Sequence, residues 1–284
     1  WGSRFLIKAA NQLADTLSFD GIRLDISDIM LEGRKLIWAE NHSYSFMLDY
    51  FGGGVLRILN AKDSEFSMLG AWRDDGEPAL GFLDFLLSNS DFSTFKLDQI
   101  LTDREGVLNS PYDYQIRRHD DGTDIQLLSE QHFSWAEQQG LIHVEKEYGL
   151  AAAGSEFTLG YKIQNTSFVA FKGFFGTLLE AGLLACGEKR GGIKVNGKEL
   201  IFDFREPLIY PEAKSVDIID RTTSSHVSIV FEQPAALLVA PLFSASSSAA
   251  PEDLQGVRIF PYWKMCLGSA EETGYKLSVR FSSG

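Results

Sequence analysis

The chain has 284 residues, 44% hydrophobic and 12% aromatic, and this composition excludes a disordered protein because it can bury a large core. The 39 acidic residues outnumber the 26 basic ones, which gives a formal net charge of -13. A field of that sign repels nucleic acids and anionic lipids, so we expect no nucleic-acid or membrane partner, whereas a neutral sugar is compatible with it.

The first stretch of the chain predicts an amphipathic helix, because leucines and alanines recur at helical spacing from Leu6 to Leu17. The sequence begins with Trp1 instead of a methionine. We therefore expect residues 1–19 to be the end of a preceding helical domain, and residues 20–284 to form a second domain.

Three consecutive glycines follow in "YFGGGVLRIL", from Gly52 to Gly54. A phosphate-binding glycine loop leads from a strand into a helix whose first amides point at the anion. Here the glycines lead into "VLRIL", which is rich in strand-forming residues, and no lysine followed by serine or threonine comes after them. The triplet therefore predicts a turn between two strands, where glycine accepts positive φ.

The segment "EPALGFLDFLL" predicts the one further helix, over residues 77–87, because Pro78 suits the first turn of a helix.

The rest of the chain alternates apolar and polar residues, as half-buried strands do. Clear examples are "EFTLGYKIQN" from Glu156, "HVSIVFE" from His226 and "GYKLSVRF" at the end of the chain. Asn196-Gly197 lies between two strand runs and predicts a type I′ hairpin turn. Asp121-Gly122 and Gly154-Ser155 predict two more hairpins. We expect an all-β fold, a large antiparallel β-sandwich with one or two short helices.

Motifs for the common catalytic centres are missing from the sequence: it has no HExxH, no CxxC and no GxSxG. We therefore expect no metal and no cofactor. The two cysteines, Cys186 and Cys266, are too few for a disulfide framework, and we interpret them as free thiols of a cytoplasmic protein.

Glu180 is the one carboxylate that stands out, because it interrupts the apolar run "FFGTLLEAGLLACG". A buried acid must be paired or hydrogen-bonded, so Glu180 is either a functional group or the structural partner of an arginine. Exposed tryptophans would offer stacking platforms for sugars, although core packing is the more common role of large aromatic residues. The tryptophans considered are Trp38, Trp72, Trp135 and Trp263.

Several segments, in this order, carry a family resemblance: "ENHSYSFMLDYFGGGVLRILNAKDSEFSML", "GEPALGFLDFLLS", "HVEKEYGLAAAGSEFTLGYKIQNTS", "GFFGTLLEAGLLA" and "LLVAPLFSASSSAAPEDLQGVRIFPYWKMCL". Together they resemble the C-terminal domain of family 57 glycoside hydrolases of the 4-α-glucanotransferase and α-amylase type. The resemblance implies a β-supersandwich similar to galactose mutarotase, covering nearly all of residues 20–284. The opening helix resembles the end of the helical region that precedes this domain.

The resemblance implies a non-catalytic domain that packs on an N-terminal catalytic barrel and contacts α-glucan or maltooligosaccharides. It transfers no catalytic residue, because the catalytic acids of the family belong to that barrel. In the family the stretch at Glu180 reads glutamate-x-asparagine, whereas Ala181 and Gly182 follow here. The residues expected to contact carbohydrate are Trp263, Tyr262, Arg258, Glu180 and Trp72.

Two other hypotheses stay open. In the first, based on analogy of fold, the chain is a stand-alone aldose epimerase. Glu180 would then be the general base, and His132 or His143 the general acid. Alternatively, it is a structural interaction module without sugar affinity.

Overall fold

A computed structural model describes residues 21–28, 33–62, 66–69, 79–88, 99–101, 106–135, 138–182, 191–200, 206–221, 224–243 and 254–283. The helix expected over residues 1–19 lies outside these residues. Strands dominate the described chain, and every pairing between them is antiparallel. The all-β expectation is thereby confirmed.

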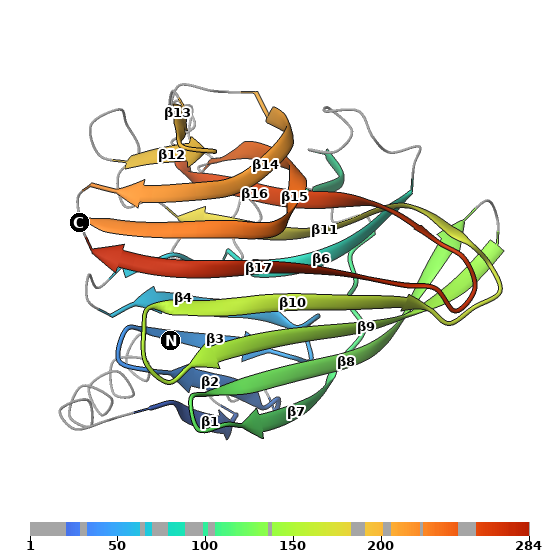
Figure 1. The fold of residues 1–284 in the computed structure, drawn as a ribbon, viewed down its shortest axis with the longest axis horizontal. Coiled ribbons are helices and arrows are strands. Elements are labelled where there is room, and N and C mark those ends of the chain that lie inside the picture. The colour runs from blue at the N-terminus through green and yellow to red at the C-terminus, as the bar shows by residue number, and fades with distance from the viewer. Residues whose placement is uncertain are drawn as a thin grey trace.

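The strands form one continuous sheet that folds back on itself into two layers (Figure 1). We call the layer with β11 (Phe171–Gly182) and β16 (Leu254–Leu267) the first layer, and the layer with β9 (Gln138–Ala151) and β10 (Glu156–Asn165) the second layer. The first layer pairs in the order β1 (Arg23–Ser27), β2 (Leu36–Glu40), β3 (Tyr44–Asp49), β4 (Val55–Ala61), β6 (Gly81–Ser88), β11 (Phe171–Gly182) and β16 (Leu254–Leu267), with β5 (Phe66–Ser67) beside β4. The second layer pairs in the order β7 (Asp113–Arg118), β8 (Gly122–Trp135), β9 (Gln138–Ala151), β10 (Glu156–Asn165) and β17 (Glu272–Ser283).

One long strand joins the layers. The first half of β15 (Ser225–Phe243) pairs with β17, and its second half pairs with β16. Along its other edge β15 pairs with β14 (Leu208–Asp220), which in turn pairs with β12 (Gly191–Val195) next to β13 (Lys198–Leu200). In Figure 1, β14 and β15 curve together through the upper part of the molecule, below β12 and β13.

The main core lies between the layers, where alternate residues of both layers meet. In β10, Phe157, Leu159, Tyr161 and Ile163 point inward and are buried, as the alternation predicted. Aromatic rings bridge the two layers, with Phe46 and Phe157 centroids 5.8 Å apart. The hydrophobic burial in this core is the main driving force for the two-layer fold.

The turns follow the sequence closely. Asn196 (φ 52°) and Gly197 (φ 77°) connect β12 to β13 with positive φ at both positions, which a type I′ turn requires. The glycine triplet forms the turn between β3 and β4, with positive φ at Gly53 and Gly54. Both expectations are confirmed. The hairpins at Asp121-Gly122 and Gly154-Ser155 are also present, between β7 and β8 and between β9 and β10.

The helix expected over residues 77–87 is wrong. Residues Gly81–Ser88 form strand β6, which pairs with β11. The apolar residues of β6 are buried on both faces, because Phe82 packs in the main core and Leu83 and Phe85 pack in a second cluster on the outward side of the first layer. A strand buried on both faces loses its alternation and cannot be distinguished by periodicity from a short buried helix.

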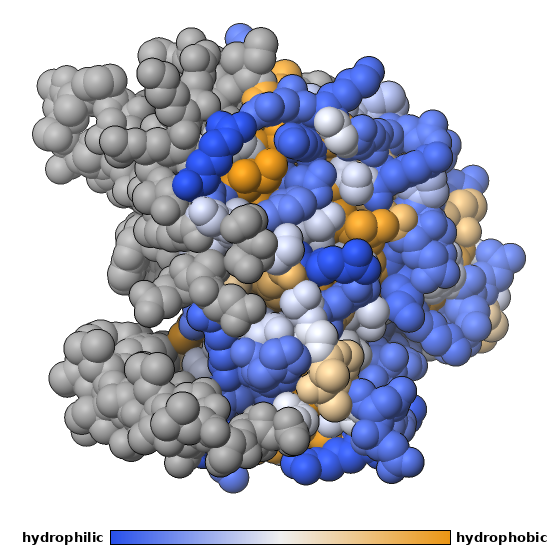
Figure 2. All heavy atoms as spheres, turned by 60° about the vertical axis from the view of Figure 1, so that its left-hand side comes forward, coloured by the Kyte–Doolittle hydropathy of each residue, from blue (hydrophilic) through white to orange (hydrophobic). Residues whose placement is uncertain are grey.

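That outward side carries a second set of buried apolar residues, which we call the outer cluster: Val55, Leu80, Leu83, Phe85, Leu87, Ile100, Leu101, Leu178, Leu238, Phe260 and Tyr262. Figure 2 shows another side of the molecule, on which the coloured residues are mostly hydrophilic and apolar ones occur in small groups. Within the described residues, no helix is long and apolar enough to cross a membrane.

Candidate functional site

Glu180 and Arg258 lie opposite each other where β11 pairs with β16. Glu180 is 1% exposed and Arg258 is 7% exposed. Arg258 Nε lies 3.5 Å from Glu180 Oε1, and the backbone N–H of Leu80 donates to Oε2 at 3.1 Å. The interpretation that this buried acid pairs with an arginine is therefore confirmed, and the carboxylate has the partners that a buried charge requires.

Tyr262 lies on the same face of β16 as Arg258, since residues two apart along a strand share a face. Its ring packs beside Phe260 at 5.8 Å and Phe174 at 6.0 Å between centroids. Burial raises the pKa of the Tyr262 phenol above its ordinary value of 10.0. Glu180, Arg258 and Tyr262 thus share the outward face of the first layer, where Glu180 and Arg258 are paired with each other.

Trp263 points to the opposite face, into the core between the layers. Its ring is stacked on Tyr275, with centroids 4.7 Å apart, and on Phe175 at 6.4 Å. Its indole N–H donates to the carbonyl of Gln233 at 3.3 Å. The structure therefore separates Trp263 from the other three candidates, and its contacts are those of a core residue.

The expected sugar contacts have little accessible surface. Trp263 and Tyr262 are each 6% exposed, although stacking on a sugar requires one accessible ring face. Trp38 is 7% exposed and packs with Leu36 and Met47. Trp72 and the side chain of Trp135 lie outside the described residues.

A second charged pair joins the two layers and was not found in the sequence. Lys146 of β9 and Asp84 of β6 are both 0% exposed. Lys146 Nζ donates to Asp84 Oδ2 at 2.9 Å and to the carbonyl of Phe82 at 2.5 Å. Tyr161 donates to Asp84 Oδ1 at 2.8 Å, with Thr177 Oγ1 3.0 Å from the same hydroxyl.

Burial is the dominant influence on this pair. It raises the pKa of Asp84 and lowers the pKa of Lys146, and the attraction between the two charges only partly opposes these shifts. The pair is sealed between the layers, so its chemistry is structural. A signal did exist, because Lys146 falls on the inward phase of an otherwise apolar alternation that includes Val144 and Tyr148.

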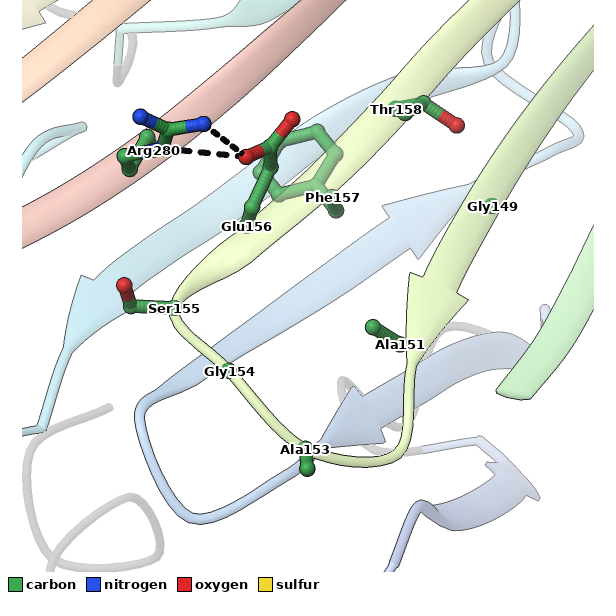
Figure 3. Close-up of a pocket in the computed structure, with 9 residues that line it drawn as sticks. All are labelled: Gly149, Ala151, Ala153, Gly154, Ser155, Glu156, Phe157, Thr158 and Arg280. Carbon is green, nitrogen blue, oxygen red and sulfur yellow. Dashed lines mark hydrogen bonds and ion pairs between the residues drawn. The ribbon is translucent and has the colours of Figure 1, made fainter. Parts of the chain in front are cut away.

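A shallow hollow of about 410 Å³ opens at the hairpin between β9 and β10 (Figure 3). Small residues form much of its lining, and Glu156 and Arg280 form its charged edge: Gly149, Ala151, Ala153, Gly154, Ser155, Glu156, Phe157, Thr158 and Arg280. The two charges already bind each other, since Arg280 Nη2 lies 2.6 Å from Glu156 Oε2. Phe157 is 1% exposed and offers no ring face to the hollow.

The proposed epimerase residues do not meet. His132 and His143 lie on the outward face of the second layer, where His143 Nδ1 is 2.9 Å from Glu130 Oε1. Glu180 lies on the outward side of the first layer, with the main core between it and both histidines. In the described parts of the chain, no group of three or more histidine, cysteine or acidic residues is arranged to hold a metal ion.

A family model described as "Alpha-amylase/4-alpha-glucanotransferase, C-terminal" matches residues 84–276. Comparison with curated protein sequences gives no match.

Solved structures share the fold. A 4-alpha-glucanotransferase from Thermococcus litoralis aligns with a TM-score of 0.69 at 18% identity, over 95% of this chain and 40% of that one. A putative aldose 1-epimerase from Escherichia coli aligns with a TM-score of 0.59 at 11% identity, over 93% of this chain and 100% of that one. A galactose mutarotase-like protein from Clostridium acetobutylicum aligns with a TM-score of 0.63 at 11% identity, over 93% and 99% of the two chains.

Proposed function

Because the chain belongs to the family of C-terminal domains of α-amylases and 4-α-glucanotransferases, we propose that it is the non-catalytic domain of an α-glucan-processing enzyme. The observation that carries this proposal is the family match over residues 84–276. The buried charges support it as well, since they form two separate closed pairs, Glu180 with Arg258 and Lys146 with Asp84. Groups held in this way stabilise or orient strands and are not positioned to transfer protons to a substrate.

The proposed partner is a catalytic barrel in the same parent chain. In support, this chain spans only 40% of the length of the Thermococcus litoralis enzyme. The coding sequence upstream of Trp1 tests the idea directly. A β/α barrel with a glutamate and an aspartate at strand ends is the expected result, and an unrelated upstream region would overturn it.

The absence of catalysis is tested separately with the 284-residue chain alone. We expect it to leave maltoheptaose unchanged, with neither shorter nor longer products in chromatography of the oligosaccharides. Product formation that purifies with this chain would contradict the non-catalytic role. The same chain joined to its upstream region is the positive control.

The proposed role includes contact with α-glucan, for which the acidic surface is suitable because the ligand carries no charge. A cytoplasmic location is part of the same proposal and is supported by Cys266, which is a free thiol.

The epimerase alternative is favoured by one observation, the alignment over the whole length of a putative aldose 1-epimerase. Against it, Glu180 and the two candidate histidines lie on opposite sides of the molecule. Polarimetry of freshly dissolved glucose or galactose decides between them. A rate above the spontaneous one, lost in Glu180→Gln, would establish the epimerase, and the spontaneous rate would exclude it.

A further inference from the structure

Phe168 is the most exposed large apolar side chain among the described residues. It is 99% exposed, compared with 50% for Phe51, 45% for Val230 and 39% for Ile209. It lies in the short connection between β10, which ends at Asn165, and β11, which begins at Phe171. A side chain with this exposure contributes almost no burial to folding, so packing does not explain a phenylalanine at this position.

The connection that carries Phe168 is held in one conformation by Asn165, which is 0% exposed. The Asn165 amide donates to the carbonyl of Val169 at 2.8 Å and to the carbonyl of Leu267 at 3.1 Å. Its side-chain oxygen accepts from both the backbone N–H and the hydroxyl of Ser167. Phe168 is therefore presented between two residues whose backbone groups are fixed to the body of the sheet, which lowers the entropy cost of binding through its ring.

Polar groups continue from the base of this loop onto the second layer. Thr166 Oγ1 lies 3.4 Å from Glu130 Oε2, and Glu130 Oε1 lies 2.9 Å from His143 Nδ1. The side chains of Glu130 and His143 are 51% and 32% exposed, so both can exchange water for hydroxyl groups of a ligand. A carboxylate with two acceptor oxygens and an imidazole are suited to a polyol.

We propose that the Phe168 loop, residues 166–170, is a surface contact site for a neutral α-glucan chain. The ring stacks on the apolar face of a glucose unit, while Thr166, Glu130 and His143 bind its hydroxyl groups. This inference rests on the proposed function, which supplies the class of ligand. The site is distinct from the residues expected from the sequence, because none of Trp263, Tyr262, Arg258 or Glu180 belongs to it.

Affinity electrophoresis of the 284-residue chain in gels with and without glycogen tests the site. We expect glycogen to retard the wild-type chain, and Phe168→Ala to weaken the apparent affinity by about tenfold, as expected for loss of a contact with one aromatic side chain. Phe168→Trp is expected to bind at least as well as wild type, whereas Phe168→Leu should resemble Phe168→Ala because it lacks a ring. Since the side chain packs on nothing, these variants should keep the wild-type circular dichroism and melting temperature.

Phe51→Ala is the matched control, because it removes another exposed phenylalanine from a turn and should leave the retardation unchanged. Equal retardation of wild type and Phe168→Ala would overturn the site while leaving the glucan-binding role intact. No retardation of the wild-type chain would overturn the site and the proposed contact with glucan together. Neither result would bear on the proposal of a catalytic partner, because the upstream sequence tests that proposal independently.

Discussion

The ion pair between Lys146 and Asp84 makes a strong prediction about stability. Lys146→Met leaves a carboxylate in the core without its counterion, and Asp84→Leu leaves an ammonium group there. Removing one partner of a buried ion pair costs about 3–5 kcal/mol. We expect each single variant to be destabilised by about that amount, because both side chains are 0% exposed and water cannot replace the lost partner.

The double variant Lys146→Met with Asp84→Leu should be much more stable than the sum of the single changes predicts. Burial outweighs the mutual attraction in shifting both pKa values, so the pair gains little over apolar side chains of similar volume. Replacing both partners of a buried pair is often neutral or stabilising by about 1–4 kcal/mol. The Tyr161 hydroxyl loses Asp84 as an acceptor in the double variant, but it keeps its hydrogen bond to Thr177, so this loss should be small.

Urea unfolding followed by circular dichroism measures these differences, and thermal melting gives an independent value at about 2–4 °C per kcal/mol. Lys162→Met is the control, because Lys162 forms a similar ion pair with Glu272 at 3.0 Å but both side chains are 52% exposed. Its loss should not change the unfolding midpoint measurably. Single variants that unfold like wild type, or a double variant whose loss equals the sum of the singles, would refute this account of the pair.

The pair also predicts a pH dependence that the double variant should lack. Burial raises the pKa of Asp84 above its ordinary value of 3.8. Between pH 3.8 and this raised pKa, the native state therefore binds more protons than the unfolded state. The stabilising contribution of Asp84 is complete below pH 3.8 and is lost as the pH rises through the raised pKa. The pKa of Lys146 is lowered below 10.5, so its contribution increases as the pH approaches 10.5. The free energy of unfolding should therefore depend on pH differently in the wild type and the double variant, falling near the pKa of Asp84 and rising near the pKa of Lys146 only in the wild type. The same pH dependence in both proteins would contradict the direction of the two pKa shifts.

Three further predictions concern packing, turns and tyrosines. Gly176→Ala should cost about 1–3 kcal/mol in urea unfolding, because the new methyl group would lie 2.3 Å from the ring of Phe260, whereas Gly160→Ala, where space is open, should be close to neutral. Gly197→Ala should cost about 1 kcal/mol in the same assay because of its φ of 77°, and an unchanged midpoint would mean that the hairpin turn adapts. Burial raises the pKa values of four tyrosines well above 10: Tyr44, Tyr112, Tyr148 and Tyr161. They should ionise only on unfolding, so stability should fall above pH 10, and tyrosinate absorbance should show fewer than 9 groups titrating in the native state.

The second layer could be predicted from the sequence because one of its faces is in water. In β9 and β10 buried and accessible residues alternate almost without exception. The short-range turn signals succeeded for a different reason, since Asn196-Gly197 and the glycine triplet act through local φ angles that do not depend on the rest of the fold.

The candidate site could be predicted only in part. Glu180 was visible as a charge within an apolar run, but its partner Arg258 lies on a strand far along the chain, and register is set by tertiary packing. Phe168 gave no signal, because a single phenylalanine in a polar loop has the same appearance in sequence whether its ring is buried or fully exposed.

The errors in the first layer share one physical cause, which is that several of its strands are buried on both faces. Strands β2 and β3 are buried at every position, so their sequences carry no period of two. The same two-sided burial made β6 resemble a helix and concealed Asp84, which reads as the polar residue of an amphipathic helix when it is in fact a charge in the core. A polar residue in a segment without alternation is therefore ambiguous until its pairing strand is known. For Asp84 the needed clue is Lys146, which lies at an inward position of β9, a strand whose buried and accessible residues alternate regularly. A search for charges on the inward phase of clear strands would have found one half of the pair, and charge balance in a closed core would then have required an acid from the opposite layer.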